Sequence, residues 1–278
     1  MKHFTAFRYH IAAMFLFSLI ITDASFAQKP QFKPGKNIEI TFPGADLPPT
    51  LHMLMRGEKA IPTLTFRLPD DYDPAKTYPL LVYVPGGDGG LKGNIYNAQT
   101  IAGANGWIAA TLPLFKKTID KSEPGGGMLV SMEDNPVVSK CYKIMLGILF
   151  ETIPNIDFGG SAMVGFSNGA VTIAVLLSSH DEFILNHFKN FCMVDHGMFH
   201  LTDLHKKGSR DGRYLILVGD KKDYGRELKI KRSMLLQDEM KLLGVKLSCK
   251  IMKDTGHEFR EKHMAIVSKW LQKESTMQ

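Results

Sequence analysis

The most specific chemical signal in the sequence is the pentapeptide GFSNG at residues 165–169, in which a serine lies between two glycines. A serine hydroxyl can act as a nucleophile when a sharp turn exposes it at the start of a helix, and flanking glycines leave room for the crowded backbone. An apolar run, residues 162–164, precedes the pattern, and a helix-forming run, residues 170–177, follows it. This context favours Ser167 as a nucleophile over an ordinary tight turn.

A serine nucleophile needs a base that removes its proton. His257 follows the last predicted strand, residues 245–252, within the sequence KDTGHEF. The other nine of the ten histidines do not have this placement after a strand near the end of the chain. We therefore predict that His257 takes the proton of Ser167 and later delivers it to the leaving group.

Two other groups of polar residues predict neither a metal site nor a phosphate site. His196 and His200 are four residues apart, with Asp195, Asp203 and His205 nearby, but Gly197 lies between them and no HExxH pattern is present. We expect these residues to lie in a solvated loop. The glycine-rich run PGGDGG at residues 85–90 lacks the Lys-Ser/Thr pair of a phosphate-binding loop. No cofactor and no metal are predicted.

Alternating strands and helices are predicted to position the serine and the histidine. Apolar runs predict strands at residues 63–68, 80–84, 107–112, 161–165, 190–194, 213–218 and 245–252. Helical spacing of apolar residues predicts helices at residues 136–153, 169–178, 228–243 and 263–272. This alternation predicts an α/β fold with a mostly parallel sheet and helices on both faces.

The first 27 residues have the pattern of a secretory signal peptide. Lys2 and Arg8 precede the apolar run 11–21, and Ser25 and Ala27 supply the small residues that signal peptidase requires. The apolar run is shorter than a membrane-spanning helix, and no cysteine follows the cleavage site to carry a lipid anchor. We predict export to the periplasm or the medium, with Gln28 as the first mature residue.

The rest of the chain is predicted to form one folded unit after an extended start. Residues 28–62 begin with a stretch rich in proline and glycine and are predicted to be an extended N-terminal segment, and residues 63–278 to be the catalytic domain. The 278 residues are 44% hydrophobic and carry a net charge of +6, but no basic stripe with interleaved aromatics predicts nucleic-acid binding. The three cysteines, Cys141, Cys192 and Cys249, allow one disulfide, although small buried side chains are favoured.

Three segments resemble a known superfamily. Residues 67–74 (RLPDDYDP), 78–87 (YPLLVYVPGG) and 165–170 (GFSNGA) resemble α/β-hydrolase esterases, in particular the polyhydroxybutyrate-depolymerase and feruloyl-esterase-like group and relatives of dienelactone hydrolase and prolyl oligopeptidase. The resemblance extends from about Thr63 to the C-terminus. It implies the α/β-hydrolase fold and a serine hydrolase that cleaves small-molecule or polymer-derived carboxylic esters through an acyl-enzyme; with the signal peptide, the protein is predicted to be a secreted serine hydrolase.

The resemblance also implies an acid between Ser167 and His257 in the chain, a few residues after a strand. Asp223 follows strand 213–218 and is the favoured acid, although it lies one residue beyond the usual spacing. Asp220 in the same turn is an alternative. Asp195 is a third, because some relatives place the acid after the preceding strand.

An oxyanion hole is implied by the same resemblance. Its two backbone N–H donors would belong to Asn168, directly after the nucleophile, and to Gly87, in the turn after strand 80–84. Pro85 stands where these esterases usually have histidine.

Several functions remain open on sequence alone. The same residues would serve a prolyl-oligopeptidase-like peptidase or an acyltransferase, and a non-catalytic binding module can keep the fold. The loops at residues 116–135 and 198–210 would govern substrate choice, but their shape does not follow from the sequence. The sequence also leaves the oligomeric state open.

Overall fold

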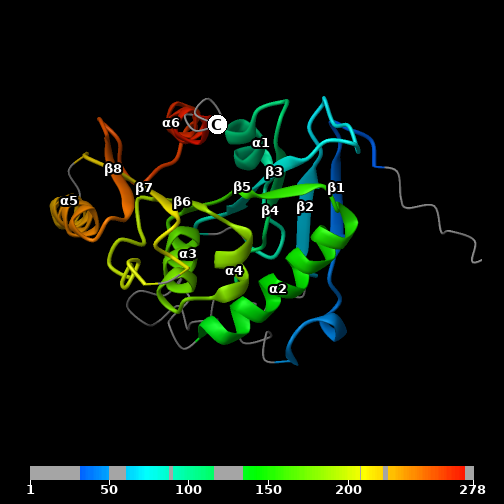
Figure 1. The fold of residues 1–278 in the computed structure, drawn as a ribbon, viewed down its shortest axis with the longest axis horizontal. Coiled ribbons are helices and arrows are strands. Elements are labelled where there is room, and N and C mark those ends of the chain that lie inside the picture. Colours follow the sequence, from blue (N-terminus) through cyan, green and yellow to red (C-terminus); the bar gives the residue numbers. More distant parts are fainter. Residues whose placement is uncertain are drawn as a thin grey trace, which may run out of the picture. The chain divides into compact units, whose positions relative to one another are not determined.

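A computed structural model describes residues 32–49, 61–87, 90–115, 134–206, 208–221 and 225–272. These residues form an eight-stranded sheet with the strand order β1-β2-β4-β3-β5-β6-β7-β8 (Figure 1). The strands are β1 Asn37–Thr41, β2 Thr63–Arg67, β3 Tyr78–Val84, β4 Ile108–Thr111, β5 Ile156–Phe166, β6 Asn190–Val194, β7 Arg213–Gly219 and β8 Lys246–Met252. β2 pairs antiparallel with both β1 and β4, and every other neighbouring pair is parallel.

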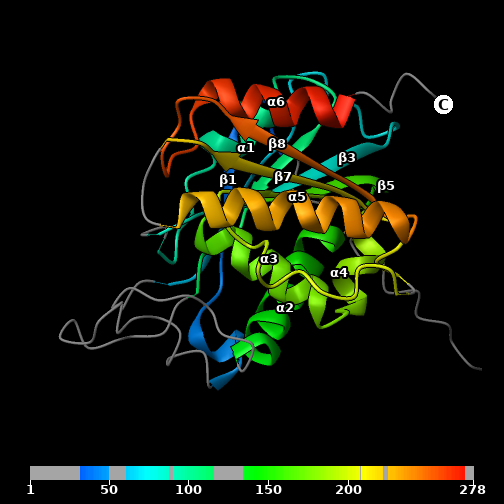
Figure 2. The same cartoon turned by 90° about the vertical axis from the view of Figure 1, so that its left-hand side faces the viewer.

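Helices cover both faces of this sheet, as Figure 2 shows. The helices α1 Tyr96–Ala102 and α6 Glu261–Gln272 lie on one face. The other face carries α2 Asn135–Thr152, α3 Asn168–Ser178, α4 Glu182–His187 and α5 Arg226–Leu242. The predicted fold class, a mostly parallel sheet with helices on both faces, is confirmed.

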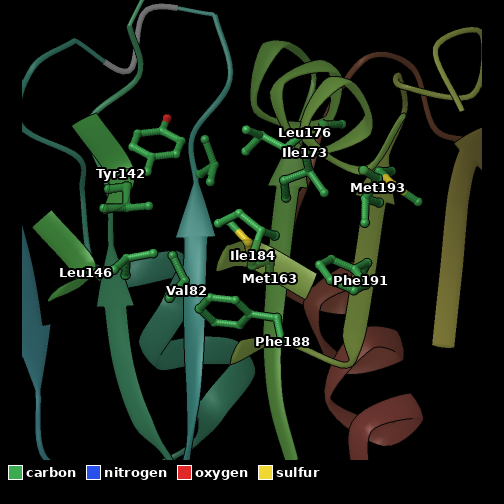
Figure 3. Packing of buried hydrophobic residues seen from close by; sticks show 14 of the residues in the cluster. Val82, Tyr142, Leu146, Met163, Ile173, Leu176, Ile184, Phe188, Phe191 and Met193 are labelled. Atoms are coloured by element: carbon green, nitrogen blue, oxygen red, sulfur yellow. The ribbon is translucent and has the colours of Figure 1, made fainter. Parts of the chain in front are cut away.

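The larger apolar core lies between the sheet and the helices α2 to α5 (Figure 3). Val82 and Met163 project from the central strands toward Tyr142 and Leu146 of α2 and Ile173 of α3. Burial of such side chains stabilises a fold by about 1.5–3 kcal/mol each before the loss of chain entropy is counted. Every residue of β6 is buried, which is the reason for its continuous apolar sequence.

The first strand begins before the predicted boundary of the catalytic domain. β1 pairs along its whole length with β2, from Asn37 opposite Arg67 to Thr41 opposite Thr63. Residues 37–41 therefore belong to the same sheet as the predicted domain, whereas the sequence placed them in an extended segment outside it. Residues 1–27, the predicted signal peptide, lie outside the described residues. None of the helices that the structure describes is long and apolar enough to cross a membrane.

The three cysteines are free thiols in this structure. Cys141 and Cys192 are buried in the two apolar clusters, and Cys249 is half-buried on β8. Burial raises the pKa of the Cys141 thiol to about 12, so this side chain stays protonated and unreactive near neutral pH.

Candidate active site

Ser167 lies in the sharp turn between β5 and α3. β5 ends at Phe166 and α3 begins at Asn168, so a single residue connects the two elements. Its φ of 53° is in the left-handed region, which residues other than glycine rarely adopt. The Ser167 N–H donates a hydrogen bond of 3.0 Å to the carbonyl of Val194 at the end of β6, and this bond helps to hold the turn. The serine thereby lies at the carboxyl edge of the sheet and at the start of a helix.

The two glycines that flank Ser167 are required by close backbone contacts. A Cβ atom on Gly165 would lie 2.5 Å from the carbonyl carbon of Gly169. A Cβ atom on Gly169 would lie 2.1 Å from the backbone oxygen of Val84. Both distances are far below any normal contact, so a larger residue at Gly165 would push the start of α3 away from β5, and a larger residue at Gly169 would push it away from β3. The GFSNG pattern thus reflects the packing of this turn.

His257 reaches Ser167 from the loop after β8. Its Nε2 atom lies 2.8 Å from Ser167 Oγ, a hydrogen-bond distance suited to proton transfer. The imidazole packs against the ring of Phe166, with the ring centroids 5.0 Å apart. The side chain of His257 is 44% exposed, whereas Ser167 is buried, so the histidine forms part of the surface around the serine. The structure brings together these two residues, which are 90 positions apart in the chain.

The carboxylate beside His257 belongs to Asp195. Its Oδ2 atom lies 2.5 Å from Nδ1 of His257. Asp195 directly follows β6, has a φ of 59°, and its backbone N–H donates a 2.7 Å hydrogen bond to the carbonyl of Leu217. The favoured acid of the sequence analysis, Asp223, lies outside the described residues, and Asp220 follows β7. The pairing with His257 is therefore made by the third alternative.

The second oxygen of Asp195, Oδ1, contacts one residue of β7 and one residue of α5. Oδ1 accepts a hydrogen bond of 3.2 Å from the Gly219 N–H and forms a salt bridge with Nη1 of Arg226. Burial alone would raise the pKa of Asp195, but the hydrogen bonds from His257 and Gly219 and the positive charges of Arg226 and Lys229 outweigh it. The pKa is consequently lowered, and Asp195 is a carboxylate at neutral pH.

The two residues predicted for the oxyanion hole belong to two segments that lie next to Ser167. Asn168 is buried at the first position of α3, where the first N–H groups of a helix have no partner within the helix. The turn after β3 lies against the serine, because a Cβ atom on Gly86 would be 2.9 Å from the Cβ of Ser167. Gly87 follows in this turn with a φ of 39°. The predicted donors are thus on the two segments that border Ser167.

His196 and His200 lie near the same edge of the sheet. Desolvation, together with the nearby charges of Lys229, His200 and His257, lowers the pKa of His196 to about 4. Nδ1 of His196 is buried without a hydrogen-bond partner in the described structure. Within the described ranges, no group of three histidine, cysteine or acidic side chains is arranged to hold a metal ion. A neutral His196 at pH 7 therefore contributes a weakly polar surface beside Asp195 and His257.

Comparisons with known proteins give structural matches without sequence matches. No protein-family model and no curated protein sequence matches the chain. An esterase from Pyrobaculum calidifontis has a TM-score of 0.53 and 14% identity, over 88% of this chain and 86% of the esterase. A feruloyl esterase module from Clostridium thermocellum, complexed with sinapinate, has a TM-score of 0.53 and 12% identity, over 87% of this chain and 89% of the module.

A thermostable esterase gives a third match, with a TM-score of 0.53 and 16% identity over 85% of this chain. The match spans only 62% of that esterase, so this chain corresponds to a part of it. At these identities the likeness concerns the arrangement of the backbone. Together with the strand order and the serine turn between β5 and α3, it shows that the chain has the α/β-hydrolase fold.

Proposed function

We propose that this protein is a serine hydrolase that cleaves carboxylic esters through an acyl-enzyme intermediate. The observation that carries the proposal is the chain of two hydrogen bonds from Ser167 Oγ to His257 Nε2 (2.8 Å) and from His257 Nδ1 to Asp195 Oδ2 (2.5 Å). We assign the acid to Asp195 in place of Asp223 because of this geometry. Nucleophile, base and acid of a hydrolase triad have this order of contacts.

In the proposed reaction, Ser167 Oγ attacks the ester carbonyl as its proton passes to His257 Nε2. Asp195 keeps the other proton on Nδ1 and stabilises the imidazolium that forms. The backbone N–H groups of Asn168 and Gly87 would bind the oxyanion of the tetrahedral intermediate. His257 then gives its proton to the departing alcohol, and water, activated by the same histidine, releases the acid.

Substitution of the serine tests the proposal directly. With a short-chain nitrophenyl ester, Ser167→Ala is expected to lower kcat/KM by about 1,000-fold or more, because the nucleophile is lost. Ser268→Ala on α6 is the matched control, and it is expected to keep wild-type activity. Equal turnover by Ser167→Ala and wild type would contradict the proposal, as would binding of the ester without turnover by the wild type.

The same triad could also catalyse the cleavage of amides, or the transfer of the acyl group to an acceptor other than water. Parallel assays with a peptide anilide and with an added alcohol acceptor separate these reactions from ester hydrolysis. The esterases with structural likeness to this chain favour an ester substrate, either a small molecule or a fragment of a polymer. An anilide cleaved faster than the ester would replace the esterase proposal by a peptidase.

We further propose that the protein is exported and that residues 1–27 are removed. The support is the sequence pattern of a positive start, an apolar run at residues 11–21 and the small residues Ser25 and Ala27. Sequencing of the N-terminus of the exported protein is expected to begin at Gln28. An intact Met1 on the exported protein would contradict the removal of residues 1–27, and protein found only in the cytoplasm would contradict export.

A further inference from the structure

We propose that Arg226 is a positioning residue that sets the basicity of His257 through the carboxylate of Asp195. This inference rests on the proposed function, because it assigns a role within the same triad. The side chain of Arg226 is 3% exposed and that of Asp195 is fully buried, and the two form a salt bridge through Nη1 and Oδ1. A hydrolase triad needs only the serine, the histidine and the acid, so this buried cation requires its own explanation.

The position of Arg226 in the helix indicates that the contact with Asp195 holds it there. Arg226 is the first residue of α5, directly after Gly225, whose φ is 77°. The amino end of a helix carries partial positive charge, so an arginine is disfavoured at this position. Burial of a guanidinium costs several kcal/mol more unless a carboxylate pairs with it. The Asp195 carboxylate offsets both costs.

The two oxygens of the Asp195 carboxylate have different partners. Oδ2 faces His257, and Oδ1 faces the Gly219 N–H and Arg226. With Oδ1 held from the side of β7 and α5, rotation of the carboxylate away from the imidazole would break a buried salt bridge. By holding Oδ1, Arg226 therefore fixes the orientation of Oδ2, which accepts the hydrogen bond from the Nδ1–H of His257.

The positive charge of Arg226 also acts on the imidazole. Asp195 stabilises the protonated ring, and Arg226 offsets part of that negative charge. Among the residues that the structure describes, the charged or titratable groups near the pair include Lys229 on α5, His196 and His200 after β6, and the ion pair of Glu258 and Arg260, which follows His257 in the chain. Except for Glu258, these groups are cations or neutral histidines, so Asp195 is the main anion that faces His257 in the described structure. Loss of the Arg226 charge should leave more of the Asp195 charge to stabilise imidazolium.

The pH dependence of serine labelling tests this role without a known substrate. A fluorophosphonate reacts with a serine that an unprotonated histidine activates, so its rate constant falls on the acid side as the histidine is protonated. Arg226→Gln keeps an N–H donor but removes the charge, and the acid limb of its profile is expected to shift to higher pH by about one unit. Arg226→Lys keeps the charge, and its acid limb is expected to stay close to that of the wild type.

A matched control is Arg232→Gln on the same helix, which removes an exposed ion pair with Glu239. Its profile is expected to coincide with that of the wild type. If Arg226→Gln is folded and its acid limb is unchanged, or if Arg226→Lys shifts as far as Arg226→Gln, the inference is overturned. A wild-type protein that is not labelled on Ser167 would instead overturn the proposed function.

A second measurement uses the wild-type chain and does not depend on the folding of a variant. The guanidinium ¹⁵N resonances of Arg226 are expected to titrate with the same midpoint as the acid limb of wild-type labelling, because Asp195 is shared by the two cations. Resonances that stay fixed through that pH range would show that Arg226 does not sense the histidine, and this result would overturn the inference.

Discussion

Asp195 is the residue on which the geometry of the site depends most, because its two oxygens contact residues from three other elements of the fold. Asp195→Asn keeps the size of the side chain, but its amide can no longer enforce the Nδ1–H tautomer of His257 or stabilise its cation. We expect this change to lower kcat/KM for ester hydrolysis by about 1,000- to 10,000-fold.

The controls for Asp195→Asn are Asp-to-Asn substitutions at the two other candidate acids. Asp220→Asn and Asp223→Asn are expected to stay within a few-fold of the wild type, measured with the same ester. If Asp223→Asn loses as much activity as Asp195→Asn, the assignment of Asp195 as the acid is contradicted and Asp223 is again a candidate.

At the residue scale, the sequence predicted the contact of Ser167 with His257 but not the identity of the acid. The glycine spacing around Ser167 is imposed by local backbone contacts, so it is visible in the sequence. The acid is different, because carboxylates follow both β6 and β7, and chain spacing does not determine which one turns toward His257. The burial of Arg226 points to a carboxylate partner, but this burial is visible only in the structure and could not identify the acid from the sequence.

At the scale of elements, the close approach of β3, β5 and α3 determines where Ser167 lies. A methyl group on Gly169 would overlap the backbone of Val84, so Gly169→Ala is expected to destabilise the protein by about 2 kcal/mol or more and to reduce labelling of Ser167. Urea unfolding measures the first effect.

Gly147→Ala is the matched control for this substitution. Gly147 lies inside α2, and a Cβ atom there would meet no atom within 4 Å. Alanine is a better helix former than glycine, so this variant is expected to be more stable than the wild type by about 0.5–1 kcal/mol. Equal loss of stability in the two variants would contradict the account of the turn.

The sequence predicted the long helices and the buried strands, but it missed three short elements. Residues 191–194 of β6 are a continuous apolar run, and the predicted bounds of this strand agree with the structure, whereas β5, predicted at residues 161–165, extends over Ile156–Phe166. The helices α1 and α4 were not predicted, because seven and six residues give too few helical turns for a clear apolar period. β1 was not predicted either, since its alternating sequence NIEIT is short and lies in a stretch rich in proline and glycine. Its pairing with β2 is a tertiary contact that local pattern does not encode.

At the scale of the whole molecule, histidines that burial or partial burial keeps neutral should make stability depend on pH. An unfolded chain protonates histidine near pH 6.5, whereas the pKa of His196 in the folded chain is lowered to about 4. Between these values the unfolded state binds more protons, so the free energy of unfolding decreases as the pH falls from about 6.5 toward 4. His200 and His263, whose pKa values are also lowered by desolvation, add to the same trend.

Substitution of His196 measures how much this residue contributes to the pH dependence of the free energy of unfolding. His196→Asn is expected to lose less stability than the wild type between pH 7 and pH 5, as measured by urea unfolding at both values. His205→Asn, at an exposed position, is the control and is expected to follow the wild type. An unchanged pH dependence in His196→Asn would contradict the burial of a neutral imidazole at this position.

The most direct test of the proposed triad is the reaction of the intact protein with a fluorophosphonate, followed by mass spectrometry of its peptides. The hydrogen bonds of Ser167 with His257 and of His257 with Asp195 predict one adduct per chain, on Ser167, and near-complete loss of labelling in His257→Ala. An unmodified Ser167, or equally fast labelling of Ser167 in His257→Ala, would contradict the central claim that the histidine activates this serine.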